Sequence, residues 1–559
     1  MTTFSDILLR SYREAPERVA VYLQHAGQED RPISYADLLE HASGYARVLE
    51  SHGIKPGDVV VLILQHGKEL IYAYFGAVLH GAIPSIMPFL TEKLSPERYR
   101  ADLSALIGVT RPAAIVTYPE FENEVRAALQ AGDSVRAVIV AEGVEPEKIM
   151  EAGQFSGMKR GEEDIVLLQH SSGTTGLQKG VALSHRAVLN QLSAYGDALM
   201  LSGEDVLVSW LPLYHDMGLI AGFLMPILKR VPLVLMSPFD WVRAPYRLMQ
   251  AVSKYRGTLS WLPNFAYNFC AQRVRERDMQ GVDLSSWRAV VNCSEPVRWE
   301  SHQAFLQAFK KYGLREMALQ TSYAMAENVF AVTQSDLSKL PVVQEIDREA
   351  FMTDRVARPA VDGRPAMKMM SSGRALSNTR VRVLDEDRQD VPEGVIGEVA
   401  LQSDCMLTGY YNRPNITREA FHQGWYLTGD YGYLSDGELF VTGRKKDMLI
   451  IGGKNVYPQD IEAIANEVDG VHKGRAVVFG MYDDRSGTEE VALVAETEAN
   501  SEEERQRIAD AIRQHVTKNS AIALRHVHIV GPKWILKTSS GKTARAANKE
   551  KFLKEVGLR

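Results

Sequence analysis

Short runs of Val, Ile and Leu alternate with helical patterns along this chain, and this alternation is the strongest constraint on its fold. Clear examples are residues 59–64, 114–116 and 137–140, each bounded by turn residues. Continuous apolar runs of this length are typical of parallel strands that helices bury on both faces. The pattern therefore predicts an α/β fold built on parallel sheets.

The chain length and a change of pattern predict more than one domain. At 559 residues, the chain is longer than one hydrophobic core can serve. Between Arg380 and Leu401 the pattern changes to that of hairpins, with turns at residues 385–387 and 392–394. This change predicts a β-rich subdomain.

A second, smaller α/β unit is predicted after residues 443–447. Residues 501–504 have the sequence of a helix-capping box, and the following helix is expected to bury one face. That face comprises Ile508, Ala511, Ile512 and Val516. We predict a large N-terminal domain over residues 1–445 and a small C-terminal domain over residues 446–559.

Composition excludes several classes of function. A net charge of -6, with basic residues mostly spread along the chain, argues against a nucleic-acid partner. Three cysteines without CxxC spacing indicate a reducing, cytoplasmic setting, with neither a disulfide framework nor a zinc site. The N-terminus lacks the features of a signal peptide. The longest apolar run, residues 217–228, is shorter than the roughly 20 residues of a membrane span, so it predicts a buried helix.

Residues 169–180 carry the strongest functional signal. Glycines in this loop permit turns with positive φ that expose N–H groups, while hydroxyls and a lysine add donors and charge. The loop therefore predicts a site for the phosphates of ATP, although a solvent-facing connection is the alternative for such a loop taken alone. It is not a Walker A motif, since the Gly-Lys-Ser/Thr triplet is missing. The residues expected to contact phosphate are Ser172, Gly173, Thr174, Thr175, Gly176 and Lys179.

Six further segments follow this loop in order. They are residues 213–218, 294–296, 322–327, 426–430, 443–455 and 537–542. Together with the loop, they resemble the ANL adenylate-forming superfamily across essentially the whole chain. The resemblance implies the ANL fold, with a small mobile C-terminal domain on a large N-terminal one, and it implies ATP-dependent adenylation of a carboxylic acid.

The resemblance also implies a role for each motif. Adenylation brings two anions together, so the site needs cations, donors and a metal rather than a general base. Glu327 is expected to bind Mg²⁺, because this hard cation typically takes only one or two protein carboxylates. Asp430 is expected to accept hydrogen bonds from both ribose hydroxyls. Further nucleotide contacts are expected from Ser294, Glu295, Pro296, Ser322, Tyr323, Ala324 and Arg444, with the Tyr323 ring facing adenine.

Three residues are expected to act at or around the reacting atoms. Lys542 is predicted to be catalytic, because its ammonium can reach the α-phosphate and the carboxylate when the small domain closes. His215 is predicted to lie on the carboxylate side, with a purely structural role as the alternative. Lys446 occupies the hinge position of the superfamily, and an ordinary exposed lysine is the alternative there.

The wall of an acyl tunnel is expected from apolar residues in and around the run that follows His215. Packing in an ordinary core is an equally good interpretation of the same side chains. They are Trp210, Leu219, Phe223, Met225 and Trp261.

Several stretches resemble the fatty acyl-AMP ligases more than the acyl-CoA synthetases, and the most telling is Tyr-Pro-Gln-Asp-Ile-Glu at residues 457–462. In that branch, an insertion on the large domain hinders the rearrangement that coenzyme A requires. Residues 335–370 are either its counterpart or an irregular surface connection. Thr174 and Ala324 depart from the residues usual in the branch, which affects branch assignment more than chemistry.

The sequence therefore predicts a cytoplasmic fatty acyl-AMP ligase that uses ATP and Mg²⁺. The expected acceptor is a separate acyl carrier protein, because no phosphopantetheine attachment site follows Lys542. We expect a monomer without stable membrane insertion. The alternatives are an acyl-CoA synthetase and a catalytically silent acyl- or nucleotide-binding protein. Intact Lys542, Glu327, Asp430 and Arg444 argue against the silent protein.

Overall fold

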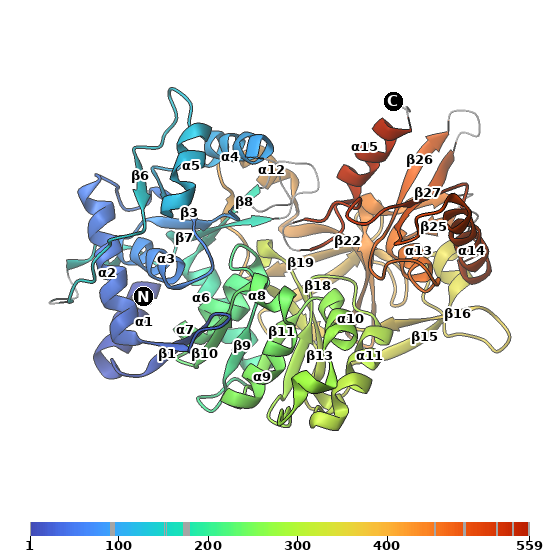
Figure 1. Cartoon of the computed structure of the whole chain (residues 1–559), viewed down its shortest axis with the longest axis horizontal. Coiled ribbons are helices and arrows are strands. Elements are labelled where there is room, and N and C mark those ends of the chain that lie inside the picture. The colour runs from blue at the N-terminus through green and yellow to red at the C-terminus, as the bar shows by residue number, and fades with distance from the viewer. Residues whose placement is uncertain are drawn as a thin grey trace.

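The architecture comes from a computed structural model, which describes residues 2–89, 96–149, 151, 154–171, 179–451, 454–483, 488–520, 522, 524–538 and 541–556. Figure 1 shows the N-terminal helices on the left of the view, a large sheet across the centre, and the C-terminal elements at the upper right. None of the helices in these ranges has the length and apolarity that a membrane span requires.

The predicted parallel strands form a four-stranded sheet in the order β4-β3-β5-β6. Alternate residues of β3 pack in opposite directions: Val59 and Val61 join a cluster with helix α4, whereas Val60 and Leu62 join a cluster with α2 and α3. Both faces of the sheet are therefore covered, and the predicted α/β class is confirmed. The elements are β3 (Val59–Ile63), β4 (Ile83–Ile86), β5 (Ala114–Thr117), β6 (Ala137–Val140), α1 (Phe4–Glu14), α2 (Tyr35–Ser51), α3 (Lys68–His80), α4 (Pro96–Thr110) and α5 (Glu122–Ala128).

A sheet of 14 strands, counted within the described residues, crosses the centre of the molecule. Its first part is mainly parallel, in the order β13-β12-β11-β9-β10-β1, with β2 antiparallel at the edge. These strands are β1 (Val19–Gln24), β2 (Arg31–Ser34), β9 (Leu207–Ser209), β10 (Leu233–Met236), β11 (Leu259–Leu262), β12 (Ala289–Asn292) and β13 (Leu319–Ala324).

The second part of this sheet is antiparallel. Strands β18 and β19 pair as the hairpin that the sequence predicts between residues 380 and 401. The strands are β14 (Ala331–Gln334), β17 (Arg374–Ala375), β18 (Thr379–Leu384), β19 (Gly397–Ser403), β21 (Phe421–His422), β22 (Trp425–Ser435) and β23 (Glu438–Arg444). The sheet therefore changes from parallel to antiparallel pairing after β13.

Helices and two small sheets complete the region before residue 446. The run 217–228 is buried, as predicted, but its first part is the π-helix η4 (Met217–Leu224), a winding that is frequent at functional sites. Residues 335–370 form the hairpin β15 (Val343–Asp347) and β16 (Ala366–Met370) around the turn η9 (Ala350–Asp354). The other elements are α6 (His185–Ala198), α7 (Met225–Leu228), α8 (Pro238–Arg243), α9 (Tyr246–Tyr255), α10 (Asn264–Arg273), α11 (Trp299–Phe309), α12 (Pro414–Glu419), β7 (Ile165–Ser171), β8 (Lys179–Ser184) and β20 (Gly409–Tyr410).

The C-terminal segment, which comprises the described residues from 446 to 556, has hydrophobic clusters of its own. Its elements are β24 (Leu449–Ile451), β25 (Lys454–Val456), α13 (Pro458–Ala465), β26 (Ala476–Asp483), β27 (Thr488–Glu496), α14 (Glu502–Ser520), β28 (His526–Val530) and α15 (Arg545–Glu555). The boundary at residue 446 stays a prediction.

Helix α14 agrees with the sequence analysis in part. Ser501 accepts a hydrogen bond from the backbone N–H of Glu504 at 3.3 Å, which is one half of the predicted capping box. The prediction that Ala511 lies on the buried face is wrong, because Ala511 is exposed. Ala509 is buried in its place, since its position on the helix lies closer to the line from Ile512 to Val516.

Buried Asp205 ties together the amino ends of three parallel strands. Its Oδ1 accepts hydrogen bonds from Thr258 Oγ1 at 2.7 Å and Arg288 Nε at 2.8 Å, and its Oδ2 accepts one from Arg288 Nη2 at 2.9 Å. These three residues directly precede or lie close to β9, β11 and β12. Burial would raise the pKa of Asp205, but hydrogen bonds, chiefly from Arg288, lower it below its usual value. The amino ends of β9, β11 and β12 are thereby fixed relative to one another.

We expect Asp205→Ala to lower the free energy of unfolding by about 3 kcal/mol at neutral pH, because it leaves the partly buried charge of Arg288 without its partner. Because the folded pKa of Asp205 is lowered, the loss of unfolding free energy relative to wild type is complete above about pH 4. This loss becomes smaller as the pH falls further. Urea unfolding followed by circular dichroism measures both effects. Asp362→Ala, at an exposed aspartate, is the control. Equal unfolding midpoints for the two variants would contradict this account.

Candidate active site

The parallel strands deliver most of the predicted site residues to one edge of the central sheet. Strands β9, β11, β12 and β13 pair in parallel, and loops that hold His215, Ser294 and Glu327 follow β9, β12 and β13. Since the carboxyl ends of parallel strands lie at one edge, these residues come from distant parts of the chain to a shared place.

Tyr323, Asp430 and Arg444 form a connected group at this edge. Tyr323 Oη donates a hydrogen bond to Asp430 Oδ2 at 2.6 Å, and Arg444 Nε lies 3.2 Å from Asp430 Oδ1. Asp430 and Arg444 face each other across the β22–β23 ladder. Burial, with the charge of Asp430 as second cause, raises the pKa of Tyr323 well above its usual value. Each carboxylate oxygen of Asp430 keeps a second lone pair with which it can accept a further hydrogen bond.

Glu327 is a buried carboxylate beside two tyrosines. Its Oε1 accepts a hydrogen bond from Tyr410 Oη at 2.8 Å, and Tyr410 Oη lies 2.9 Å from Tyr426 Oη. Burial raises the pKa of Glu327, while Tyr410 and Arg444 oppose the shift. Lys179 Nζ lies 4.8 Å from the centre of the Tyr410 ring, so the lysine at the end of the predicted phosphate loop lies close to Glu327.

Lys542 of the C-terminal segment lies within electrostatic range of His215 and Asp216. Burial and then the positive charge of Lys542 lower the pKa of His215 to about 3. Burial raises the pKa of Asp216, and Lys542 and Arg444 oppose that shift. The turn before Lys542 reaches α10, because a Cβ on Gly541, whose φ is +85°, would lie 3.6 Å from the Phe265 ring. The predicted catalytic lysine therefore lies within electrostatic range of the predicted carboxylate-side histidine.

The remaining predicted nucleotide contacts differ in how they are placed. Ser294 adopts φ +71°, which is rare for a residue with a side chain. Glu295 Oε2 accepts a hydrogen bond from Phe265 N at 2.9 Å, which caps α10. Ser322 Oγ donates to Thr333 O at 2.7 Å and so points at β14. Pro296 and Ala324 are half-buried.

Part of the predicted phosphate loop lies outside the described residues, namely Ser172, Gly173, Thr174, Thr175 and Gly176. The predicted hinge, Lys446, is exposed in the turn η10 (Lys445–Asp447) that follows β23.

The predicted tunnel residues are all buried, and the contacts that the structure gives for them are core contacts. Trp210 stacks on Trp241 with ring centres 3.5 Å apart, and Trp261 Nε1 donates to Tyr195 Oη at 2.7 Å. Phe223 packs on Phe75 of α3, and Leu219 and Met225 are buried in the run 217–228. Their place in a tunnel stays a prediction.

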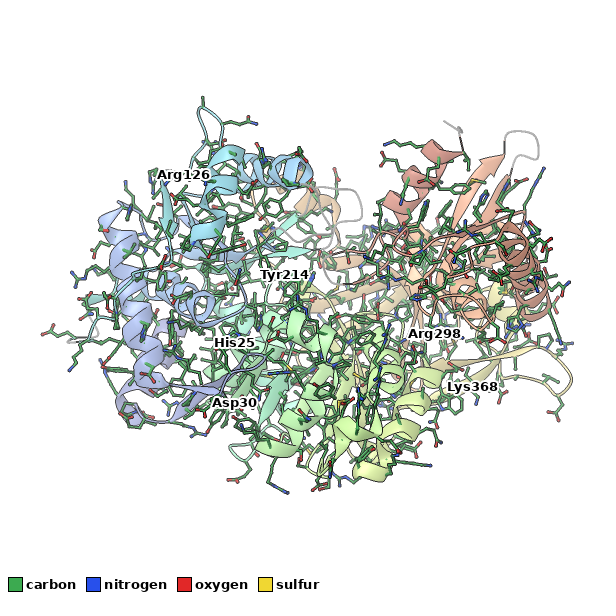
Figure 2. All side chains as sticks on the ribbon, viewed as in Figure 1. His25, Asp30, Arg126, Tyr214, Arg298 and Lys368 are labelled. Carbon is green, nitrogen blue, oxygen red and sulfur yellow. The ribbon has the colours of Figure 1, made fainter. Side chains whose placement is uncertain are left out.

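A small apolar cavity of about 10 Å³ lies beside Tyr214, which Figure 2 labels near the middle of the molecule. A space of this size holds about one water molecule, and none of the predicted tunnel residues lines it. Its walls are Leu64, His66, Leu70, Ile86, Phe89, Leu213, Tyr214, Pro238 and Phe239.

Sequence reasoning missed three polar residues at the site. Asp216 lies in the motif 213–218, within electrostatic range of Lys542, but the motif drew attention to His215 instead. Tyr410 belongs to none of the predicted motifs. Tyr426 is the first residue of the motif 426–430. Only its place in the same motif as Asp430 could have suggested that it lies at the site.

A family model and several known proteins are similar to this chain. Residues 8–411 match the family model described as AMP-binding enzyme. The chain belongs to this family. The long-chain-fatty-acid AMP ligase FadD26 of Mycobacterium bovis is 32% identical, with 93% of this chain and 92% of that protein covered. The medium-chain-fatty-acid acyl-carrier-protein ligase JamA of Moorena producens is 29% identical, with 99% and 95% covered.

Solved structures agree with this assignment. A structure from a study of fatty acyl-adenylate ligases of E. coli and L. pneumophila has a TM-score of 0.89 and 30% identity, and the match covers 100% of this chain and 99% of that one. The predicted resemblance to the fatty acyl-AMP ligase branch of the ANL superfamily is thus confirmed, as is the prediction of an AMP-forming ligase.

We expect the His215 ring to stay neutral between about pH 5 and 8, because burial and Lys542 lower its pKa to about 3. Imidazole NMR spectra across this range, with the His215→Gln spectrum to assign the signal, measure this directly. His52 is exposed and serves as the reference signal. A His215 signal that titrates between pH 5 and 8 would contradict the burial of its ring and the position described for Lys542.

Proposed function

We propose that this AMP-binding enzyme activates a fatty acid as its acyl adenylate and then transfers the acyl group to the phosphopantetheine thiol of a separate acyl carrier protein. The observation that carries this proposal is that Lys542 lies within electrostatic range of His215 and Asp216, and that Asp216 also lies within range of Arg444 in the Tyr323–Asp430–Arg444 group. A cation thus lies next to the place where an acid and a nucleotide would join. The ligation to acyl carrier protein named for JamA supports the choice of acceptor.

In the first half-reaction, an oxygen of the fatty carboxylate attacks the α-phosphorus of ATP. The bond from that phosphorus to the bridging oxygen breaks, and pyrophosphate leaves. Lys542 lowers the repulsion between the two anions and stabilises the charge of the transition state. The neutral ring of His215 is placed to orient the carboxylate. In the second half-reaction the carrier thiolate attacks the acyl carbon, and AMP leaves.

The nucleotide contacts follow from the same geometry. Asp430 accepts from the ribose hydroxyls with its second lone pairs, and Arg444 beside it approaches ribose or phosphate. Tyr323 lies against the adenine ring, opposite the backbone of residues 294–296. Lys179, beside Tyr410, and the loop Ser172–Gly176 hold the phosphates.

Mg²⁺ is part of this proposal, and the residues of the site suit it. No group of three or more His, Cys, Asp and Glu side chains in the described ranges forms a metal cage. Glu327 would therefore hold the ion together with phosphate oxygens and water, a set that Mg²⁺ accepts. Bound there, the cation would neutralise phosphate charge and favour the ionised form of Glu327, whose pKa burial raises.

The proposal extends to the organisation of the enzyme. Residues 1–445 form the large domain and residues 446–559 the small one, which turns about Lys446 between the half-reactions. The tunnel walls remain Trp210, Leu219, Phe223 and Trp261. The enzyme works as a monomer in the cytoplasm, a reducing setting in which its three free, buried cysteines are stable.

A single reaction mixture tests this function: the enzyme, a series of fatty acids of different chain length, ATP, Mg²⁺, holo-acyl carrier protein and coenzyme A, with mass spectrometry of all products. We expect acyl-AMP, pyrophosphate and acyl-carrier protein. Lys542→Ala should lower the adenylation rate by about 10²–10³-fold, by analogy with loss of a preorganised donor. Lys554→Ala, on the exposed side of α15, is the matched control.

Two results would overturn the proposal. Acyl-CoA as the main thioester would assign the enzyme to the acyl-CoA synthetases. Absence of pyrophosphate release with every acid tested would leave a binding protein without catalysis.

A further inference from the structure

The motif Tyr-Pro-Gln-Asp-Ile-Glu at residues 457–462 contains no residue to which the proposed chemistry assigns a role, yet five of its six side chains make contacts that the structure describes. It forms the start of α13, with Tyr457 as its N-cap and Pro458 at the first helical position. Its side chains divide into two groups. One contacts residues that precede the hinge, and the other contacts the segment that carries Lys542.

The first group joins α13 to the large part of the molecule. Asp460 Oδ1 lies 2.5 Å from Nη2 of Arg298, the residue that precedes α11. Gln459 Nε2 donates to the backbone oxygen of Thr442 at 2.9 Å, and Thr442 Oγ1 lies 3.1 Å from Tyr457 Oη. Figure 2 labels Arg298 below the C-terminal elements.

Tyr457 also anchors the motif by burial. Only 3% of its surface is exposed, and it belongs to an aromatic cluster with Tyr431, Tyr433 and Phe440 of the strands β22 and β23. Its ring centre lies 6.0 Å from that of Phe351, in the turn η9 between β15 and β16. The motif is thus bound to two elements of the large part at once.

The second group joins α13 to the Lys542 segment. Ile461 is buried in the core of the C-terminal segment. Glu462 forms an ion pair with Arg545 and accepts a hydrogen bond from Val478 N at 2.8 Å. Arg545 begins α15 and follows Lys542 by only three residues. A continuous series of contacts therefore runs from Arg298 through α13 to the catalytic lysine.

We propose that Arg298, Gln459 and Asp460 are positioning residues for adenylation: they hold α13, and through Glu462 and Arg545 they keep Lys542 on the side of His215 and Asp216. This inference rests on the proposed function for its catalytic consequence. The small domain must release the Arg298–Asp460 ion pair and the Gln459–Thr442 hydrogen bond before it can turn for thiol transfer. Arg298, Asp460 and Gln459 are half-exposed, which suits contacts that form and break in each cycle, whereas the Thr442 side chain is buried.

Charge reversal tests the proposal, because a second reversal on the partner residue restores the ion pair. Asp460→Arg and Arg298→Asp each place like charges together and should lower the rate of pyrophosphate release by about tenfold, within the range for contacting charged pairs. The double variant Arg298→Asp/Asp460→Arg restores the pair and should recover the wild-type rate to within about threefold. Glu503→Arg, an exposed reversal on α14, is the matched control and should have no effect.

The distance between α11 and α14 reports the position of the C-terminal segment independently of catalysis. Spin labels are placed at Gln307→Cys on α11 and Lys518→Cys on α14, which are exposed positions, whereas the native cysteines are buried. We expect one narrow distance distribution in the wild type, a second longer population in Asp460→Arg, and a single population again in the double variant. This readout needs no catalysis, so it stands even if the wild type fails to adenylate any acid.

The outcomes decide the proposal in either direction. Unchanged distances in Asp460→Arg, or a double variant that is no better than the single ones, would overturn it. A lower unfolding temperature in Asp460→Arg with an unchanged distance distribution would assign the pair a role in stability alone, which also overturns it.

Discussion

Repulsion between two anions is the physical constraint on which this molecule is built. A fatty carboxylate and a polyphosphate must approach closely, and in the proposed mechanism the opposing charge comes from a different part of the chain than the nucleotide contacts. Lys542 comes from the C-terminal segment, whereas Asp430, Arg444 and Glu327 come from the central sheet and its connections. The burial that raises the pKa of Glu327 and lowers that of His215 also strengthens every charge interaction in this place.

Three parts of the fold place the charged and polar groups that this constraint requires. The Asp205–Arg288 network fixes the amino ends of β9, β11 and β12, and the loops at their carboxyl ends carry the chemistry. The change from parallel to antiparallel pairing after β13 brings the β22–β23 hairpin into the same sheet, so that Asp430 meets Tyr323. Helix α13 then connects this frame to Lys542. Site residues more than 200 positions apart in the sequence, such as His215 and Asp430, are held by one framework.

Sequence alone predicted the layered α/β class, the hairpin at residues 380–401 and the residues that meet at the sheet edge, because apolar periodicity and ordered motifs are local signals. The sequence did not predict contacts between side chains that lie far apart along the chain. Nothing local indicated that Tyr410 would bond to Glu327, that Ser322 would point at β14, or that Asp460 would pair with Arg298. The misplacement of Ala511 has a different cause, since Ala509 lies closer than Ala511 to the line from Ile512 to Val516 on the helix.

The most direct test of the central claim is a crystal structure with an acyl-sulfamoyl adenosine, a stable analogue of the acyl adenylate. The account predicts ribose hydroxyls within hydrogen-bond distance of Asp430, the adenine ring against Tyr323, and the Lys542 ammonium on the sulfamoyl group beside His215. An adenosine bound elsewhere, or bound at Asp430 with Lys542 turned away from the acyl linkage, would contradict it.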